Sequence, residues 1–69
     1  MKLSARNILK GKVVLVIAGA VNSKVVLELP GGSQIVSIIT KESAESLGLA
    51  PGKTAYAVIK ASNVMIGID

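Results

Sequence analysis

Cysteine and histidine are both absent from this sequence of 69 residues. Without them the chain has no disulfide to stabilise a small fold and lacks the usual ligands of a zinc site. Thiol nucleophiles and imidazole bases are excluded as well. We expect no carboxylate pair to replace them from the acidic residues, which are Glu28, Glu42, Glu45 and Asp69. The sequence therefore predicts a protein that is not an enzyme and has no resident metal or cofactor.

Phenylalanine and tryptophan are also absent, and Tyr56 is the only aromatic residue. Proteins that bind single-stranded nucleic acid stack bases on aromatic side chains, which contributes about 1–3 kcal/mol per base. We expect Tyr56 to be largely buried in a strand. The net charge of +4 suits an anionic partner or serves solubility alone. Nucleic-acid binding is therefore disfavoured and is kept only as an alternative.

No apolar run is long enough to cross a membrane. The longest, residues 13–21, is interrupted by Gly19 and falls well short of the roughly 20 residues that a transmembrane helix needs. Basic residues at Arg6, Lys10 and Lys12 precede this run, and no convincing cleavage site follows it. We expect a soluble cytoplasmic protein that has no membrane partner.

Apolar residues are nevertheless abundant, at 51% of the sequence with a mean hydropathy of +0.64. A domain of this size buries only about 60% of the surface that its unfolded chain exposes. In the absence of disulfides and metals, association is the remaining way to stabilise such a domain. The surplus of apolar residues therefore predicts subunit interfaces, and so a homo-oligomer.

Valine and isoleucine recur between short turns, which is typical of β-strands. The predicted strands are residues 11–18, 24–29, 34–40, 54–60 and 63–68. The first is apolar on both faces, which predicts a core on one side and a neighbouring subunit on the other. One of these faces would hold Val13, Leu15 and Ile17, and the other would hold Val14, Val16 and Ala18.

The second strand alternates more regularly, with Val25 and Leu27 inward and Lys24 and Glu28 outward. A turn at residues 19–23 precedes it, and Asn22 is suited there to a positive φ.

The strand-like alternation of apolar residues stops in residues 40–49, and residues typical of helix ends occur on both sides of this segment. Thr40 can cap the N-terminus and Glu42 favours the first turn, while Gly48 can end the helix in the left-handed conformation before Leu49. Five short strands with one helix between the third and fourth is the order of the OB fold. We therefore predict an all-β, five-stranded Greek-key barrel that forms a single domain over residues 1–69.

Hydrogen-bond donors are concentrated in three segments that could hold an anion. The first, before the first strand, contains Ser4, Ala5, Arg6 and Asn7, and Arg6 presents a planar fork of donors. The second is the helix start, where Thr40 and Ser43 lie beside unpaired amides. The glutamate of that turn, Glu42, must then point away. The third is the turn that contains Lys60, Ala61, Ser62 and Asn63.

Each of these segments, taken singly, also fits an ordinary solvated arm, helix cap or turn. Together they offer donors only. A fully deprotonated tetrahedral dianion accepts hydrogen bonds at every oxygen, whereas protonated phosphate also requires an acceptor. A site of this kind therefore suits molybdate, tungstate or sulfate, with Arg6 and Lys60 balancing the charge.

The motifs in these segments resemble those of the molbindin family, whose Mop-type domain also recurs in molybdate transport ATPases and molybdate-responsive regulators. The resemblance covers essentially the whole chain. It rests on Ser-Ala-Arg-Asn at residues 4–7, Ile-Thr-Lys-Glu-Ser-Ala-Glu-Ser-Leu-Gly-Leu at 39–49, Gly-Lys at 52–53 and Val-Ile-Lys-Ala-Ser at 58–62.

This resemblance implies a hexamer, built as a trimer of dimers, that stores and buffers molybdate or tungstate inside the cell. The oxyanion would be held between subunits, with Ser4, Ala5 and Arg6 of one subunit opposite Thr40, Ser43, Lys60 and Ala61 of another. Ser62 belongs to the same turn. A second class of site near the threefold axis is assigned to Gly19, Ala20, Val21 and Asn22. A purely structural oligomerisation module with adventitious anion binding is a further alternative.

Overall fold

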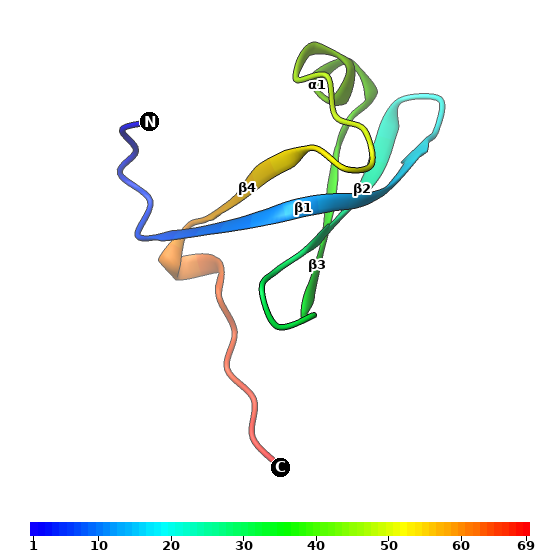
Figure 1. The fold of residues 1–69 in the computed structure, drawn as a ribbon. Coiled ribbons are helices and arrows are strands. Elements are labelled where there is room, and N and C mark those ends of the chain that lie inside the picture. The colour runs from blue at the N-terminus through cyan, green and yellow to red at the C-terminus, as the bar shows by residue number, and fades with distance from the viewer.

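A computed structural model describes all residues, 1–69, as a curled antiparallel sheet with one short helix (Figure 1). The elements are β1 (Asn7–Ala18), β2 (Asn22–Glu28), β3 (Gln34–Thr40), α1 (Lys41–Ser46), β4 (Thr54–Ile59) and the 3₁₀ turn η1 (Ala61–Asn63). The strand order is β3-β2-β1-β4, so β3 and β4 are the two edges of the sheet. This is a small all-β, OB-like fold.

Strand β2 confirms part of the predicted alternation. Val25 and Leu27 are buried and Lys24 and Glu28 are exposed, but Val26 is buried as well, so the strand does not alternate throughout. Each position of β2 pairs with β3 on one side, from Asn22 opposite Thr40 to Glu28 opposite Gln34. A strand with three consecutive buried residues that pairs on both sides is a suitable centre for the sheet.

Strand β1 is longer than predicted, and its two faces differ from the prediction. Its pairing with β2 shifts between Val13 and Leu15, which marks a β-bulge at Val14. A bulge inserts one residue and so exchanges the faces of the positions that follow it. Val13 and Val16 therefore both contact the core, whereas Leu15 and Ile17 are exposed. The prediction that Val13, Leu15 and Ile17 share one face is wrong, because strict alternation does not survive a bulge.

The predicted fifth strand, residues 63–68, is absent, so the expectation of five strands is wrong for the single chain. Asn63 closes the 3₁₀ turn, and residues 64–69 have no regular structure. Their alternation suits a pleated strand, but a strand also requires a partner for its backbone groups. In this chain the segment runs away from the sheet (Figure 1).

Helix α1 follows its predicted boundaries because both ends are capped. The side chain of Thr40, in extended conformation, accepts a hydrogen bond from the N–H of Ser43. At the other end Gly48 has a φ of +64°, and the N–H groups of Gly48 and Leu49 donate to the carbonyls of Glu45 and Ala44. This pair of bonds is a Schellman motif, which requires the left-handed conformation that glycine adopts without strain.

The turn between β1 and β2 does not use Asn22 in the predicted way. No residue other than glycine has a positive φ, and Asn22 is the first residue of β2. The N–H of Gly19 donates to the carbonyl of Asn22 over 2.7 Å. A Cβ at Gly19 would lie 2.9 Å from that same oxygen, so a close approach at Gly19 shapes the turn.

The core is small for so apolar a chain. Val13, Val25 and Leu27 form its buried centre, with Val16, Ile39 and Leu49 among the residues packed against it. Large apolar side chains remain exposed on strands β1, β3 and β4 and in residues 64–68. Tyr56 is 49% exposed, so the expectation that it is largely buried is wrong for the isolated chain. No helix has the length and hydrophobicity needed to cross a membrane.

Candidate functional site

One group of predicted donors lies where β1 begins and β4 ends. Asn7, the first residue of β1, pairs with Ile59, the last residue of β4. Arg6 and Lys60 are the next residues beyond this pair, so the antiparallel register places them at facing positions. Both side chains are exposed, whereas Ala5 is partly buried. The topology therefore brings Arg6 and Lys60 of the same chain together. This differs from the arrangement that the molbindin resemblance implies, in which Lys60 and Ala61 lie on the subunit opposite Arg6.

A second group of donors lies at the start of α1. The Thr40 hydroxyl donates to the Ser43 Oγ over 2.7 Å, and the Ser43 N–H donates to the Thr40 Oγ1 over 3.0 Å. Thr40 therefore uses its proton internally, whereas the Ser43 O–H is free to donate to a ligand. Because the Ser43 oxygen already accepts a hydrogen bond, its own O–H is a stronger donor.

These hydroxyls line an open hollow with Glu42, Ser46 and Leu47. Ser46 adds a hydroxyl that the sequence analysis did not consider. Ser46 could have been found from the sequence, because residues three apart in a helix, such as Ser43 and Ser46, lie on the same face. Glu42, which the sequence analysis expects to point away from an anion, is itself one of the residues that line this hollow.

The turn that was assigned to a second class of site lies beside this hollow. Asn22 pairs with Thr40 across β2 and β3, and the Lys41 N–H donates to the Val21 carbonyl over 2.7 Å. Gly19 and Ala20 complete the turn next to them. The structure therefore places Gly19, Ala20, Val21 and Asn22 against the helix start, at the end of the sheet away from Arg6.

The two donor groups lie at opposite ends of β1. Asn7 at its start pairs with Ile59, and Ala18 at its end pairs with Ser23, next to Asn22 and Thr40. A strand of 12 residues has a contour length of about 40 Å. A tetrahedral oxyanion is only a few ångströms across, so one copy of the chain cannot enclose it with both groups.

The side chains of this chain do not form a candidate metal site. The chain has no group of three or more His, Cys, Asp or Glu side chains that could hold a metal ion. No buried side-chain nitrogen or oxygen lacks a hydrogen-bond partner. The two donor groups provide hydrogen-bond donors and positive charge at exposed positions, and these suit the binding of an anion.

The sequence profile of the TOBE domain matches residues 3–66, which include both donor groups. The chain belongs to the TOBE-domain family. Among curated relatives, this TOBE domain is 53% identical over 66 residues to molybdenum-pterin-binding protein 3 of Clostridium pasteurianum, covering 96% of this chain and 97% of the relative. It is 46% identical over 69 residues to a probable molybdenum-pterin-binding protein of Haemophilus influenzae, covering both chains completely.

Solved structures of similar TOBE domains share the fold. MopII from Clostridium pasteurianum superposes with a TM-score of 0.92 at 49% identity, covering 97% of this chain and 100% of MopII. The cytoplasmic molybdate-binding protein ModG, with molybdate bound, gives a TM-score of 0.96 at 55% identity. All of this chain then corresponds to 49% of ModG. These relatives confirm the resemblance to the molbindin family.

Proposed function

We propose that this TOBE domain binds molybdate or tungstate between the subunits of a cytoplasmic homo-oligomer and so stores and buffers the oxyanion. The observation that carries the proposal is the similarity to ModG, which holds molybdate and matches this chain over its whole length at 55% identity. The chain would act as a single domain and without catalysis.

The chemistry of the donor groups supports this choice of ligand. Arg6 and Lys60 provide positive charge at one end of the sheet, and Ser43 provides a hydroxyl whose proton is free at the other. Molybdate and tungstate carry two negative charges and accept hydrogen bonds at all four oxygens. Charge-assisted hydrogen bonds to such an ion are roughly twice as strong as neutral ones.

A site between subunits follows from the distance between the two groups. The Arg6 group of one copy and the Thr40 group of another can converge where those of a single copy cannot. We place Ser4, Ala5 and Arg6 on one side of the oxyanion and Thr40 and Ser43 on the other. Lys60 accompanies Arg6, because the register of β1 and β4 ends on the pair next to them. Ala61 and Ser62, which follow Lys60, complete this side of the proposed site.

The many exposed apolar side chains support assembly. Ile17, Val36 and Ile38 are each more than half exposed on the single copy. Large exposed apolar side chains in this number are typical of an interface in soluble proteins. A hexamer built as a trimer of dimers, which the molbindin resemblance implies, gives these side chains a place to be buried.

Equilibrium dialysis against molybdate in the presence of excess sulfate tests the proposal. We expect near-stoichiometric retention of molybdenum, measured by elemental analysis of the protein, that sulfate does not displace. Sulfate has the same charge and shape but is smaller, so a selective site must be matched in size. Retention that falls to background in excess sulfate would support the alternative of a structural module with adventitious anion binding.

Two other ligand classes are tested with the same protein. Single-stranded oligonucleotide is assayed by gel shift at low and moderate salt, and we expect no binding because Tyr56 is the only aromatic side chain. The names of the curated relatives include a pterin, so a pterin without molybdenum is added as a competitor. We expect no competition, because a pterin needs acceptors as well as donors along its edge.

A further inference from the structure

The turn at residues 50–53 precedes β4 and ends on Lys53. It is a type II turn, because the Lys53 N–H donates to the Ala50 carbonyl over 3.1 Å and Gly52, at the third position, has a φ of +93°. The Val13 N–H donates to the Lys53 carbonyl over 2.8 Å, and the Gly52 N–H donates to the Val13 carbonyl over the same distance. Val13 belongs to the buried centre of the core, so the backbone of Lys53 is fixed to the core of the sheet.

The side chain of Lys53 extends to the C-terminal end of α1. A Cβ added to Gly48 would lie 3.3 Å from the Lys53 Nζ, so the ammonium is beside the residue that ends the helix. No backbone N–H donates to the carbonyls of Leu47 and Gly48. The last turn of α1 contains no basic residue of its own. Because the C-terminal end of a helix carries a partial negative charge, a cation there is stabilising. Lys53 supplies this cation from a neighbouring turn.

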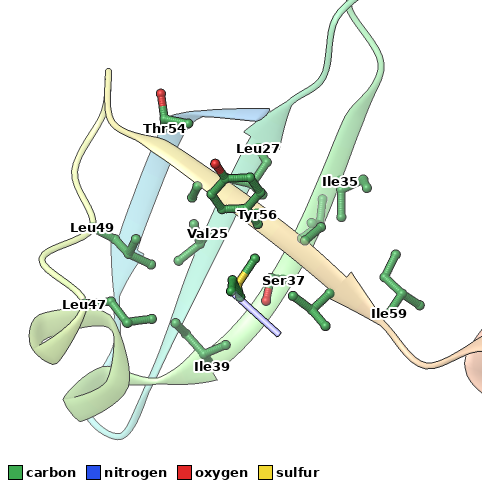
Figure 2. Close-up of a pocket in the computed structure, with 15 residues that line it drawn as sticks. Val25, Leu27, Ile35, Ser37, Ile39, Leu47, Leu49, Thr54, Tyr56 and Ile59 are labelled. Atoms are coloured by element: carbon green, nitrogen blue, oxygen red, sulfur yellow. The ribbon is translucent and has the colours of Figure 1, made fainter. Parts of the chain in front are cut away.

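Helix α1 is attached to the sheet at few other points. Of its six residues only Ala44 is buried. At its start, the Lys41 N–H donates to the Val21 carbonyl over 2.7 Å. Beyond its end, Leu49 packs against the core, and Figure 2 shows it beside Val25, where both line an apolar groove. A contact at the C-terminal end is therefore a large part of what holds this helix.

The two ends of α1 are close to each other. Six helical residues rise only about 9 Å, so a shift at the C-terminal end also moves the residues at the start. Ser43 is in the first turn, and its oxygen accepts a hydrogen bond from the Thr40 hydroxyl. The direction of the remaining Ser43 O–H therefore depends on how the helix is held.

We propose that Lys53 is a positioning residue of the oxyanion site. Its ammonium holds the C-terminal end of α1 and thereby fixes the direction in which the Ser43 O–H points to the ligand. This inference rests on the proposed function, because it requires that Ser43 donates to the oxyanion. It goes beyond that function by giving a role to a residue that neither donor group includes and that acts through Ser43.

Isothermal titration with molybdate compares three variants. Lys53→Met keeps the apolar stem and removes the charge, and we expect Kd to rise about two- to fivefold, the factor that corresponds to a cation at a helix C-terminus. Lys53→Arg keeps the charge and should bind like the unsubstituted protein. Lys12→Met is the matched control, because it removes the same charge from the exposed position of β1 that pairs with Thr54. Equal Kd values for Lys53→Met and Lys12→Met overturn the proposal.

A double-mutant cycle with Ser43→Ala shows whether Lys53 acts through Ser43. Once the hydroxyl is removed there is nothing left to orient, so Lys53→Met should not raise the Kd of Ser43→Ala any further. A direct attraction between the ammonium and the dianion would raise Kd by the same factor with and without the hydroxyl, and so would a general loss of stability. Equal factors in the two backgrounds therefore overturn the proposal.

Amide hydrogen exchange tests the same contact without any ligand. The Ser43 N–H is protected by its hydrogen bond to the Thr40 Oγ1. We expect this N–H to exchange about two- to fivefold faster in Lys53→Met and at the original rate in Lys53→Arg. The N–H of Val25, in the central strand β2, should keep its rate in both variants. An unchanged rate at Ser43, or an equal acceleration at Ser43 and Val25, overturns the proposal.

The two kinds of measurement separate this proposal from the proposed function. If the unsubstituted protein binds no molybdate, the proposed function is refuted, and the role of Lys53 in the site is refuted with it, whatever the exchange rates are. If the unsubstituted protein binds molybdate and Lys53→Met leaves its Kd unchanged, only the role of Lys53 is refuted.

Discussion

Thr40 and Ser43 hold each other through a pair of hydrogen bonds, a hydroxyl-to-hydroxyl bond of 2.7 Å and an amide-to-hydroxyl bond of 3.0 Å. The two residues consequently have different roles. The Thr40 oxygen caps α1 by accepting a hydrogen bond from the Ser43 N–H. The Ser43 hydroxyl accepts from Thr40, so its own O–H can donate to a ligand. Substitution can separate these roles.

Replacing Ser43 with alanine should weaken molybdate binding and leave stability nearly unchanged. The loss of one hydrogen bond to a charged ligand, about 1.5–3 kcal/mol, corresponds to at least a tenfold rise in Kd. The cap survives because it uses the backbone N–H of Ser43. Isothermal titration measures the Kd, and urea denaturation at fixed protein concentration measures stability. Ser33→Ala is the control, and equal Kd values for the two variants would exclude Ser43 from the site.

Replacing Thr40 with alanine should reduce both properties. Loss of an N-cap side chain costs about 1 kcal/mol of folding free energy. Binding weakens as well, because Ser43 loses the hydroxyl that orients it. Thr40→Ser retains the capping oxygen and should behave like the unsubstituted protein in both assays. Unchanged stability in Thr40→Ala would contradict the assigned cap.

Arg6→Ala should weaken molybdate binding by about 1.5–3 kcal/mol, the scale of a charge-assisted hydrogen bond. Lys10→Ala is the matched control, because it removes the same charge from an exposed position farther along β1. A general effect of net charge would weaken binding equally in both variants, and equilibrium dialysis at two salt concentrations distinguishes it. Unchanged binding in Arg6→Ala removes Arg6 from the site.

Glu42→Gln should tighten oxyanion binding. Glu42 is one of the residues that line the hollow with Thr40 and Ser43, so its negative charge should repel a dianion held there. Exposed charges interact by roughly 0.2–1 kcal/mol, which corresponds to a decrease in Kd of up to about fivefold. Glu45→Gln, on the same helix but outside the hollow, is the control. A Kd that rises in Glu42→Gln would show that the carboxylate accepts a proton of the ligand.

Gly48→Ala should destabilise the fold by about 1–2 kcal/mol, the difference for a side chain in the left-handed conformation. Gly48 has a φ of +64°, and the only neighbour of an added Cβ is the Lys53 amine at 3.3 Å, which can move away. The expected loss of stability in Gly48→Ala is therefore caused by the backbone conformation and not by crowding of the added methyl group. Gly48→Asn should recover much of the loss, since asparagine tolerates this conformation better than alanine. Urea denaturation compares all three proteins.

Local features were predictable because short-range chemistry determines them. Thr40 and Gly48 marked the ends of α1, and both ends are found in the structure with their expected hydrogen bonds. The alternation of β2 identified its buried face for the same reason. The donor segments around Arg6 and Thr40 were recognisable from residue type, although their place in an oxyanion site stays a prediction.

The errors in prediction arose where a residue depends on neighbours that are distant in sequence. The bulge at Val14 is visible only when β1 is paired with β2, so the faces of Leu15 and Ile17 were assigned wrongly. Residues 63–68 have a strand pattern but find no partner within the chain.

By itself the sequence determined that this protein is a small all-β domain with a capped helix, too apolar to be buried alone and equipped with donors for an anion. Only the tertiary structure decided that Arg6 lies with Lys60, that Thr40 lies with the turn at residues 19–22, and that these groups stand at opposite ends of β1. The reason is physical. Periodicity and caps act over a few residues, whereas the separation of the two donor groups is a property of strand register across the whole sheet.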